Sequence, residues 1–339
     1  MRGKPVVRVI PIVVAAVALV FAVCGGGAPP TIAAAAQAQV VLKMGHTLPP
    51  GDAFDVAATK LAELVAAKSK GQVKVEVFPG GQLGNDRELI EALRLGNVDM
   101  SIQGNNNYDT FVPETALFDL PFLYRDRQTA FRALDSPTGQ QVWSLVREQI
   151  GVRILAVAEN GFRQITTAKK PIRTLADLKG LKMRVPQTKL SMDTFKALGT
   201  IATPITFTEL FTALQAGVVD GQENALGLID SAKLYEVQKF LMLTNHQYDG
   251  APIAISEKTW KTLTPDQQNW VQQAAIEARD FQRRYVVARD EDLMKKLQAA
   301  GMTVISPARD EFVKAVEPVI DSYKARSPSI NLAKIVAGQ

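Results

Sequence analysis

Short apolar runs alternate with amphipathic segments along most of the chain. The runs have the composition of strands and cover residues 42–44, 74–78, 98–102, 152–157, 181–185 and 218–220. Helical spacing of apolar residues covers residues 54–68 and 192–198. Strands that alternate with helices favour parallel-rich mixed sheets covered by helices. The pattern therefore predicts an α/β fold.

Two of the expected helices begin with capping signals. Asn85 stands three residues before Glu88, and Thr206 stands three residues before Glu209. A threonine followed three residues later by glutamate can exchange two hydrogen bonds with the first turn of a helix. We therefore predict a full capping box at Thr206.

A long helical pattern begins at Thr264 and Pro265 and continues without glycine or proline to Gly301. Threonine at the cap, proline in the first turn and glycine past the end are typical of one helix. About 35 residues at roughly 1.5 Å each give about 50 Å, which is longer than a small domain. Such a helix would span both halves of the protein. The alternative is two helices, with a break near residues 289–292.

An internal repeat links the two halves of the chain. Residues 88–99 read ELIEALRLGNVD and residues 209–220 read ELFTALQAGVVD, which agree at seven of twelve positions. Each is preceded, at a different distance, by a strand that contains the letters LKM. Two matches in the same order predict that both halves of the chain share one arrangement of strands and helices, a βα plan. A chain of roughly 300 residues is also at the length where one core divides into two.

The first residues have the pattern of a secretory leader. Arg2, Lys4 and Arg8 precede an uncharged run over residues 9–23, and an A-x-A cleavage pattern lies at residues 36–38. We predict a signal peptide over residues 1–38. The alternative of a transmembrane anchor needs about 20 apolar residues, and this run is shorter. Lipid attachment at Cys24 is a further alternative, against which Val23 argues, because such sites usually have a small residue there.

Charge and cysteine content exclude several classes of function. The predicted leader holds three of the 39 basic residues and none of the 34 acidic ones, so the rest has a net charge of about +2. Without a basic run, we expect no nucleic-acid partner. Cys24 is the only cysteine, so cleavage would leave no thiol for a zinc-cysteine, iron-sulfur or cysteine-nucleophile site. His46 and His246 are the only histidines, so we predict no metal site and no cofactor.

Polar and cationic residues end or follow the expected strands. In open parallel sheets, ligands bind outside the carboxyl ends of the strands. The residues expected there include His46, Gln103, Asn105, Asn106, Asn107, Glu159, Asn160, Arg163, Arg184, Gln187, Gln222, Glu223 and Asn224. Each has a simpler interpretation: asparagines favour turns, single arginines are common on surfaces, and His46 is typical of a hydrogen-bonding loop. Two arginines at strand ends in one half nevertheless favour a site for a carboxylate, which a guanidinium binds through two parallel hydrogen bonds.

Several longer motifs resemble a known family. They are GFRQIT at 161–166, DLKGLKMRVP at 177–186, ALQAGVVDGQEN at 213–224, GQLGNDRE at 81–88, LPFL at 120–123 and YEVQKF at 235–240. The chain closely resembles the substrate-binding proteins of tripartite ATP-independent periplasmic (TRAP) transporters, the DctP family. The resemblance covers essentially all of the chain after the predicted leader.

The resemblance implies a two-lobed periplasmic binding protein of the type II-like architecture, with a long helix spanning both lobes. We expect lobe I to comprise residues 39–161 and about 250–290, and lobe II residues 162–249 and about 291–339. By the same resemblance, Arg184 would pair with a ligand carboxylate, and Asn224 would hold that carboxylate. Arg163 would support or contact it, and Phe207 would line the site.

The ligand is expected to be a small carboxylate. The segment 103–108 and the loop 46–53 differ from the sialic-acid-binding branch, which argues against sialic acid. Four amides at Gln103, Asn105, Asn106 and Asn107 could pair with vicinal hydroxyls. This favours a sugar acid, such as a uronate or an aldonate. A C4-dicarboxylate or a 2-oxo acid is the alternative, in which Arg163 takes a second carboxylate or has only a structural role.

The resemblance also implies a periplasmic location and delivery of the ligand to the small and large membrane permease subunits. We expect a monomer. A ligand-binding protein that serves an extracytoplasmic sensor is an alternative. A periplasmic enzyme is a weaker one, because no G-x-S-x-G, H-E-x-x-H, Ser-x-x-Lys or paired-cysteine motif is present. No catalytic residue is therefore predicted.

Overall fold

The computed structural model describes residues 39–339. The predicted signal peptide and Cys24 lie outside these residues. Within residues 39–339, none of the helices combines the length and the apolar character needed to cross a membrane.

Within residues 39–339, nine strands form one mixed sheet with the order β2-β1-β3-β8-β4-β7-β5-β6, and β9 pairs with β8. Five of the strand pairings are parallel and three are antiparallel. The parallel-rich mixed sheet predicted from the sequence is therefore confirmed. The strands are β1 (Val40–Gly45), β2 (Val73–Phe78), β3 (Met100–Ile102), β4 (Val152–Thr167), β5 (Lys182–Val185), β6 (Ile201–Pro204), β7 (Gly221–Ala225), β8 (Phe240–Ser256) and β9 (Thr303–Ile305).

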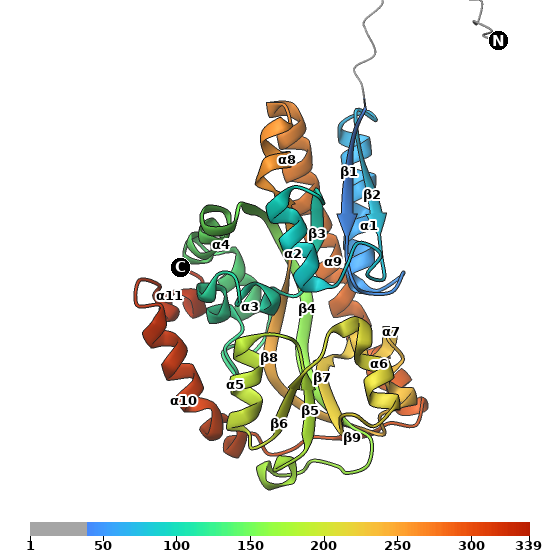
Figure 1. Cartoon of the computed structure of the whole chain (residues 1–339), viewed down its shortest axis with the longest axis vertical. Helices are drawn as coiled ribbons and strands as arrows, with labels where there is room; N and C mark the ends of the chain where they lie inside the picture. The colour runs from blue at the N-terminus through green and yellow to red at the C-terminus, as the bar shows by residue number, and fades with distance from the viewer. Residues whose placement is uncertain (1–38) are drawn as a thin grey trace, which may run out of the picture. The chain divides into compact units, whose positions relative to one another are not determined.

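Helices surround the sheet (Figure 1). The α-helices are α1 (Ala53–Lys68), α2 (Asp86–Leu95), α3 (Arg127–Asp135), α4 (Pro137–Ile150), α5 (Lys189–Ala197), α6 (Phe207–Gln215), α7 (Leu226–Ser231), α8 (Glu257–Thr262), α9 (Pro265–Ala299), α10 (Asp310–Arg326) and α11 (Leu332–Ala337). The 3-10 helices are η1 (Asn105–Tyr108), η2 (Pro113–Phe118), η3 (Leu175–Leu178) and η4 (Leu234–Glu236).

The internal repeat corresponds to two copies of one βαβαβ unit. In the first unit, β1 pairs in parallel with β2 and β3. In the second unit, β5 pairs in parallel with β6 and β7. The repeated dodecamers form α2 and α6 together with the turns that lead to β3 and β7. The shared plan expected from the sequence is thus present, whereas the exact lobe boundaries stay a prediction.

Strands β4 and β8 are the longest and connect the two units. They run antiparallel through the middle of the view in Figure 1, with β3 beside β8 and β7 beside β4. Their ladder shifts register between Ile154 and Ala156, between Glu159 and Gly161, and between Arg163 and Ile165. Such bulges bend a strand and redirect its side chains. Two of the three lie beside residues of the site described below.

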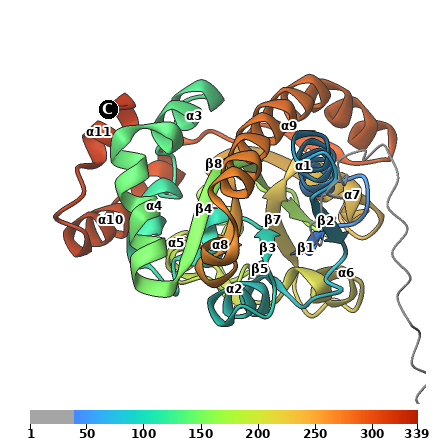
Figure 2. The same cartoon turned by 90° about the horizontal axis from the view of Figure 1, so that it is seen from above.

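The long helical pattern forms a single helix, α9, without a break near residues 289–292. The hydroxyl of Thr264 accepts the backbone N–H of Gln267, and the Gln267 side chain accepts the N–H of Thr264, which is a full capping box. Figure 2 shows α9 along one side of the molecule, where it packs against α1 and α7. These helices belong to the regions around the first and second βαβαβ units, so α9 reaches both.

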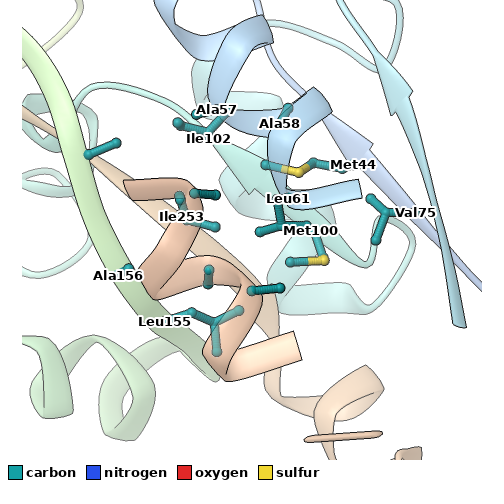
Figure 3. Close-up of a cluster of buried hydrophobic side chains, with 14 of the residues drawn as sticks. Met44, Ala57, Ala58, Leu61, Val75, Met100, Ile102, Leu155, Ala156 and Ile253 are labelled. Atoms are coloured by element: carbon teal, nitrogen blue, oxygen red, sulfur yellow. The ribbon is translucent and has the colours of Figure 1, made fainter. Parts of the chain in front are cut away.

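The first unit has a core of apolar side chains between its strands, α1 and α9 (Figure 3). Met44 and Met100 point from the strands toward Leu61 of α1, and Leu155 and Ile253 extend this core along β4 and β8. Burying a side chain of this size contributes about 1.5–3 kcal/mol. A separate core that includes Met183 and Phe195 lies in the second unit. Each unit therefore has a rigid base for the residues at its strand ends.

Three local predictions were wrong. The strand placed at residues 218–220 begins instead at Gly221, so Gln222, Glu223 and Asn224 lie within β7 rather than after it. The strand placed at 152–157 continues to Thr167, so Arg163 also lies within a strand. Of the capping signals at Asn85 and Thr206, only the one at Asn85 forms a full capping box. The hydroxyl of Thr206 donates to the carboxylate of Glu209 at 2.8 Å and does not cap the backbone.

Candidate functional site

A pocket lies where the ends of both βαβαβ units face β4 and β8. The lining residues are Thr47, Leu48, Phe54, Asn85, Asp86, Arg87, Gly104, Asn106, Asn107, Thr110, Asn160, Arg163, Arg184, Pro186, Gln187, Thr206, Phe207, Asn224, Leu228 and Asp249.

Seven of the ten residues predicted for the site line this pocket. They are Arg163, Arg184, Asn224, Phe207, Asn106, Asn107 and Gln187. The other three are fully buried outside its lining. His46 lies 3.3 Å from the carboxylate of Asp55. Asn105 donates to Asp119 and to the carbonyl of Thr115, and Gln103 is buried behind the lining.

Arg184 is held with its guanidinium toward the pocket. Its Nε donates to the carbonyl oxygen of Ile205 at 2.8 Å, and none of the described residues accepts a hydrogen bond from its two terminal nitrogens. Burial and the nearby charge of Arg163 lower the pKa of Arg184 to about 10, while Glu223 and Asp86 oppose this shift. The guanidinium is therefore charged at neutral pH and has two nitrogens for an acceptor in the pocket.

Arg163 lies beside Arg184 but is already bonded. Its Nε and Nη2 donate to the two carboxylate oxygens of Glu223 at 2.5 and 2.9 Å, and its Nη1 donates to Asp249 at 3.1 Å. Nη2 also lies 2.9 Å from the side-chain oxygen of Asn224. Only 2% of the residue is exposed. The guanidinium of Arg163 is thus already bonded to protein groups, and whether it also contacts a ligand stays a prediction.

Glu223 balances the charge of Arg163. Burial raises its pKa, but the attraction of Arg163 and a hydrogen bond with His246 outweigh burial and bring the pKa to about 2. His246 Nε2 lies 3.2 Å from the carboxylate, and burial lowers the pKa of this histidine. Arg163 is therefore paired with carboxylates, whereas Arg184 has no ion pair within residues 39–339.

Asp249 connects Arg163 to the amides of the pocket. Its carboxylate accepts from Asn160 Nδ2 at 2.6 Å and from the backbone N–H of Asn106 at 3.4 Å. Burial raises the pKa of Asp249 to about 6, against the effect of Arg163. Gly104 makes this packing possible, because a Cβ there would lie 2.7 Å from the Asp249 carboxylate.

The first turns of α2 and α6 also face the pocket, through Asp86 and Phe207. Helix N-termini carry partial positive charge and favour anions. Asp86 accepts a hydrogen bond from Thr47 at 2.9 Å, and burial raises its pKa. Asp86 was not among the residues predicted for the site from the sequence. The capping signal at Asn85 offered a clue, because a helix that follows a strand begins at the ligand-binding edge of the sheet.

Apolar side chains complete the walls. Phe207 and Phe54 come from opposite units, and Leu48 and Leu228 lie with them in the lining. A pocket with a few convergent polar groups between apolar walls is typical of small-molecule sites. The described residues contain no group of three His, Cys, Asp or Glu side chains placed to hold a metal ion. The fold and this pocket define a protein that binds a small organic anion.

Comparison with known families agrees with this class. The family described as bacterial extracellular solute-binding protein, family 7 (DctP) matches residues 44–326. The chain therefore belongs to the DctP family of TRAP transporter solute-binding proteins, as the sequence motifs predicted. This family consists of binding proteins that serve transport.

Relatives and solved structures cover most of the chain. The 2,3-diketo-L-gulonate-binding periplasmic protein of Escherichia coli (strain K12) is 34% identical over 84% of this chain and 90% of its own length. The sugar acid binding protein of Advenella mimigardefordensis, in complex with galactonate, superposes with a TM-score of 0.85 at 34% identity, over 89% of this chain and 98% of its own. A TRAP periplasmic solute binding protein from Polaromonas, bound to D-erythronate, gives 0.84 at 36% identity, over 88% and 99%.

Proposed function

We propose that this protein captures a sugar acid, such as an aldonate or a uronate, in the pocket between its two βαβαβ units. The observation that carries the proposal is Arg184, a buried guanidinium with a fixed Nε and two terminal nitrogens toward the pocket. A carboxylate that accepts both parallel hydrogen bonds would neutralise this charge. Asn224 also lines the pocket, and its second side-chain N–H can hold that carboxylate.

The rest of the lining matches a ligand with several hydroxyl groups. Asn106, Asn107 and Gln187 offer amides, Thr206 offers a hydroxyl, and Asp86 offers a carboxylate. Amides both donate and accept, and a hydroxyl does the same, so vicinal hydroxyls can pair with them. Hydrogen bonds to charged groups contribute about 1.5–3 kcal/mol each. A few such bonds support micromolar binding, about −8 kcal/mol, after the cost of association.

A C4-dicarboxylate fits this pocket less well. Its second carboxylate would need a second cation, but Arg163 is already paired with Glu223 and Asp249. Arg87 is the other cation of the lining, and 57% of its side chain is exposed, where an ion pair contributes little. A 2-oxo acid would leave most of the amides of the lining without a partner. The relatives that bind 2,3-diketo-L-gulonate, galactonate and D-erythronate also support a sugar acid.

The family supports a role in uptake. In this role the protein acts in the periplasm as a monomer and delivers its ligand to the small and large subunits of a TRAP permease. The ligand leaves the pocket unchanged, so the protein has no enzymatic activity. The same pocket would also serve a sensor, and a growth test on the ligand as sole carbon source with the permease genes deleted separates the two roles.

The test of the proposal begins with a thermal-shift screen of aldonates, uronates, C4-dicarboxylates and 2-oxo acids. A ligand that binds the folded state raises the melting temperature according to its affinity. We expect the sugar acids to give the largest increase. Calorimetry with the best ligand then compares Arg184→Met with the control Arg173→Met, which changes an exposed arginine outside the pocket. Unchanged affinity in Arg184→Met, or a larger shift with the dicarboxylates, would contradict the proposal.

A further inference from the structure

A second cavity, of about 460 Å³, lies between α9, α7 and the middle of β4. It is larger than the ligand pocket. Figure 2 shows α7 beside α9, which form two of its walls. The proposed binding of a sugar acid does not use this cavity.

Much of the wall is apolar. It includes Phe162, Leu226, Leu243, Val286, Leu293 and Met294. A sugar acid has too little apolar surface to cover such a wall, whereas an aromatic ring or an alkyl chain would bury it at a gain of about 25 cal/mol for each Å². The cavity therefore favours a ligand with an apolar body.

Most of the charged residues in the wall have partners. Arg127 pairs with Glu159 and with Asp290, and Asp230 lies 2.7 Å from the amine of Lys296. Asp52 caps α1, where it accepts the backbone N–H of Phe54 at 3.2 Å. The acidic side chains of the wall are thus each bound to a donor.

Arg289 differs from the others. Among residues 39–339 no carboxylate lies within ion-pair distance of it, and its only side-chain hydrogen bond goes to the hydroxyl of Tyr285. Its guanidinium also lies over the Tyr285 ring, 4.9 Å from the centroid. This stacking orients the cation on the wall of the cavity, one helical turn from Tyr285.

We propose that this cavity is a second binding site, which takes an amphiphilic organic anion. Its aromatic or aliphatic body lies against the apolar wall, and its single acidic group pairs with Arg289. The site is next to the ligand pocket, because Asn160 and Leu228 line both cavities. Asn160 donates to Asp249 in the ligand pocket, and its own Oδ1 is buried without a donor among the described residues. Both sites can be occupied at once.

Fluorescence titration with 1-anilinonaphthalene-8-sulfonate, an aromatic anion, tests the proposal. We expect saturable binding to the purified protein. Arg289→Gln should weaken this binding about tenfold, because a charge-assisted hydrogen bond is lost. Arg284→Gln is the matched control, since Arg284 is an exposed arginine of α9 outside the cavity. The uncharged probe N-phenyl-1-naphthylamine should bind wild type and Arg289→Gln equally.

Gly227 allows the cavity itself to be tested. This glycine lines the cavity, and a Cβ there would have no heavy atom within 4 Å. Gly227→Leu should fill the space and abolish binding of both probes, whereas Gly227→Ala should retain it. Binding that survives Gly227→Leu, or equal affinities in Arg289→Gln and Arg284→Gln, would overturn the proposal. If Gly227→Leu fails to fold, the comparison of the two arginine variants decides.

A titration of the two ligands together separates this proposal from that for the sugar acid. A saturating sugar acid should leave the sulfonate probe bound, and Arg184→Met should lose the sugar acid while it keeps the probe. Full displacement of the probe by the sugar acid would place the probe in the ligand pocket and refute a second site.

Discussion

The same substitution should destabilise the protein strongly at Arg163 and only slightly at the neighbouring Arg184. Arg163→Met and Arg184→Met both remove a buried guanidinium and keep most of the apolar stem. Arg163→Met removes the hydrogen bonds to Glu223, Asp249 and Asn224. Arg184 gives up a single hydrogen bond, to the carbonyl of Ile205.

The expected change in the free energy of unfolding depends on which buried groups each substitution leaves without a partner. Without Arg163, the buried carboxylate of Glu223 keeps only His246 as a side-chain partner, and removing one member of a buried ion pair costs about 3–5 kcal/mol. Without Arg184, a buried and unpaired cation disappears, so the free energy of unfolding should change by about 1 kcal/mol or less, since the one lost hydrogen bond is offset. Adding Glu223→Gln to Arg163→Met should recover part of the loss.

Urea denaturation at neutral pH, followed by circular dichroism without ligand, measures these differences. The slope of the transition should stay constant, so that midpoints report stability. Sugar-acid affinity should be lost in Arg184→Met despite its normal stability. A loss below about 1 kcal/mol in Arg163→Met, or equal losses in the two variants, would refute the assignment of a structural ion pair to Arg163 and a free cation to Arg184.

Three further changes test other parts of the pocket. Gly104→Ala should cost about 1–3 kcal/mol in urea denaturation, because its Cβ would meet Asp249 at 2.7 Å; a neutral result would contradict the packing. Asn107→Ala should weaken sugar acids by about tenfold but hardly affect short dicarboxylates in calorimetry, and equal losses would argue against hydroxyl pairing. Burial raises the pKa of Glu159 to about 7, although the charge of Arg127 lowers it. Between about pH 4.5 and 7, the folded state therefore holds a proton on Glu159 that the unfolded state has lost. Relative to Glu159→Gln, wild type should therefore gain about 1 kcal/mol or more as the pH falls from 7.5 to 5, and parallel curves would contradict this.

Much of the architecture could be predicted from local patterns. The start of α9 follows from Thr264 and Pro265, and its continuity follows from the absence of glycine and proline up to Gly301. The repeated dodecamer predicted a shared plan, because equal sequences at equal places in a βα unit bury the same face. Arg184 could be selected because it lies near the carboxyl end of a short strand, where a charged side chain reaches the edge of the sheet.

The errors concern polar residues that are buried through partners far away in the sequence. Gln222, Glu223 and Asn224 look like a loop, but in β7 their side chains pair with Thr166, Arg163 and one another. Asn105 resembles its two neighbours in sequence and yet bonds to Asp119 under the pocket. Local composition cannot separate these cases, since apart from the Asn224–Gln222 pair these partners are 14 to 61 residues away in the sequence.

The ladder between β4 and β8 has a consequence for how this protein can evolve. The same two strands hold the sheet together and carry Asn160, Arg163 and Asp249 toward the ligand pocket. Deleting one residue from either strand would turn every later side chain to the opposite face. Substrate preference can therefore change by substitution at the loops and helix starts around the pocket, whereas insertions and deletions in β4 and β8 would destroy recognition and folding together.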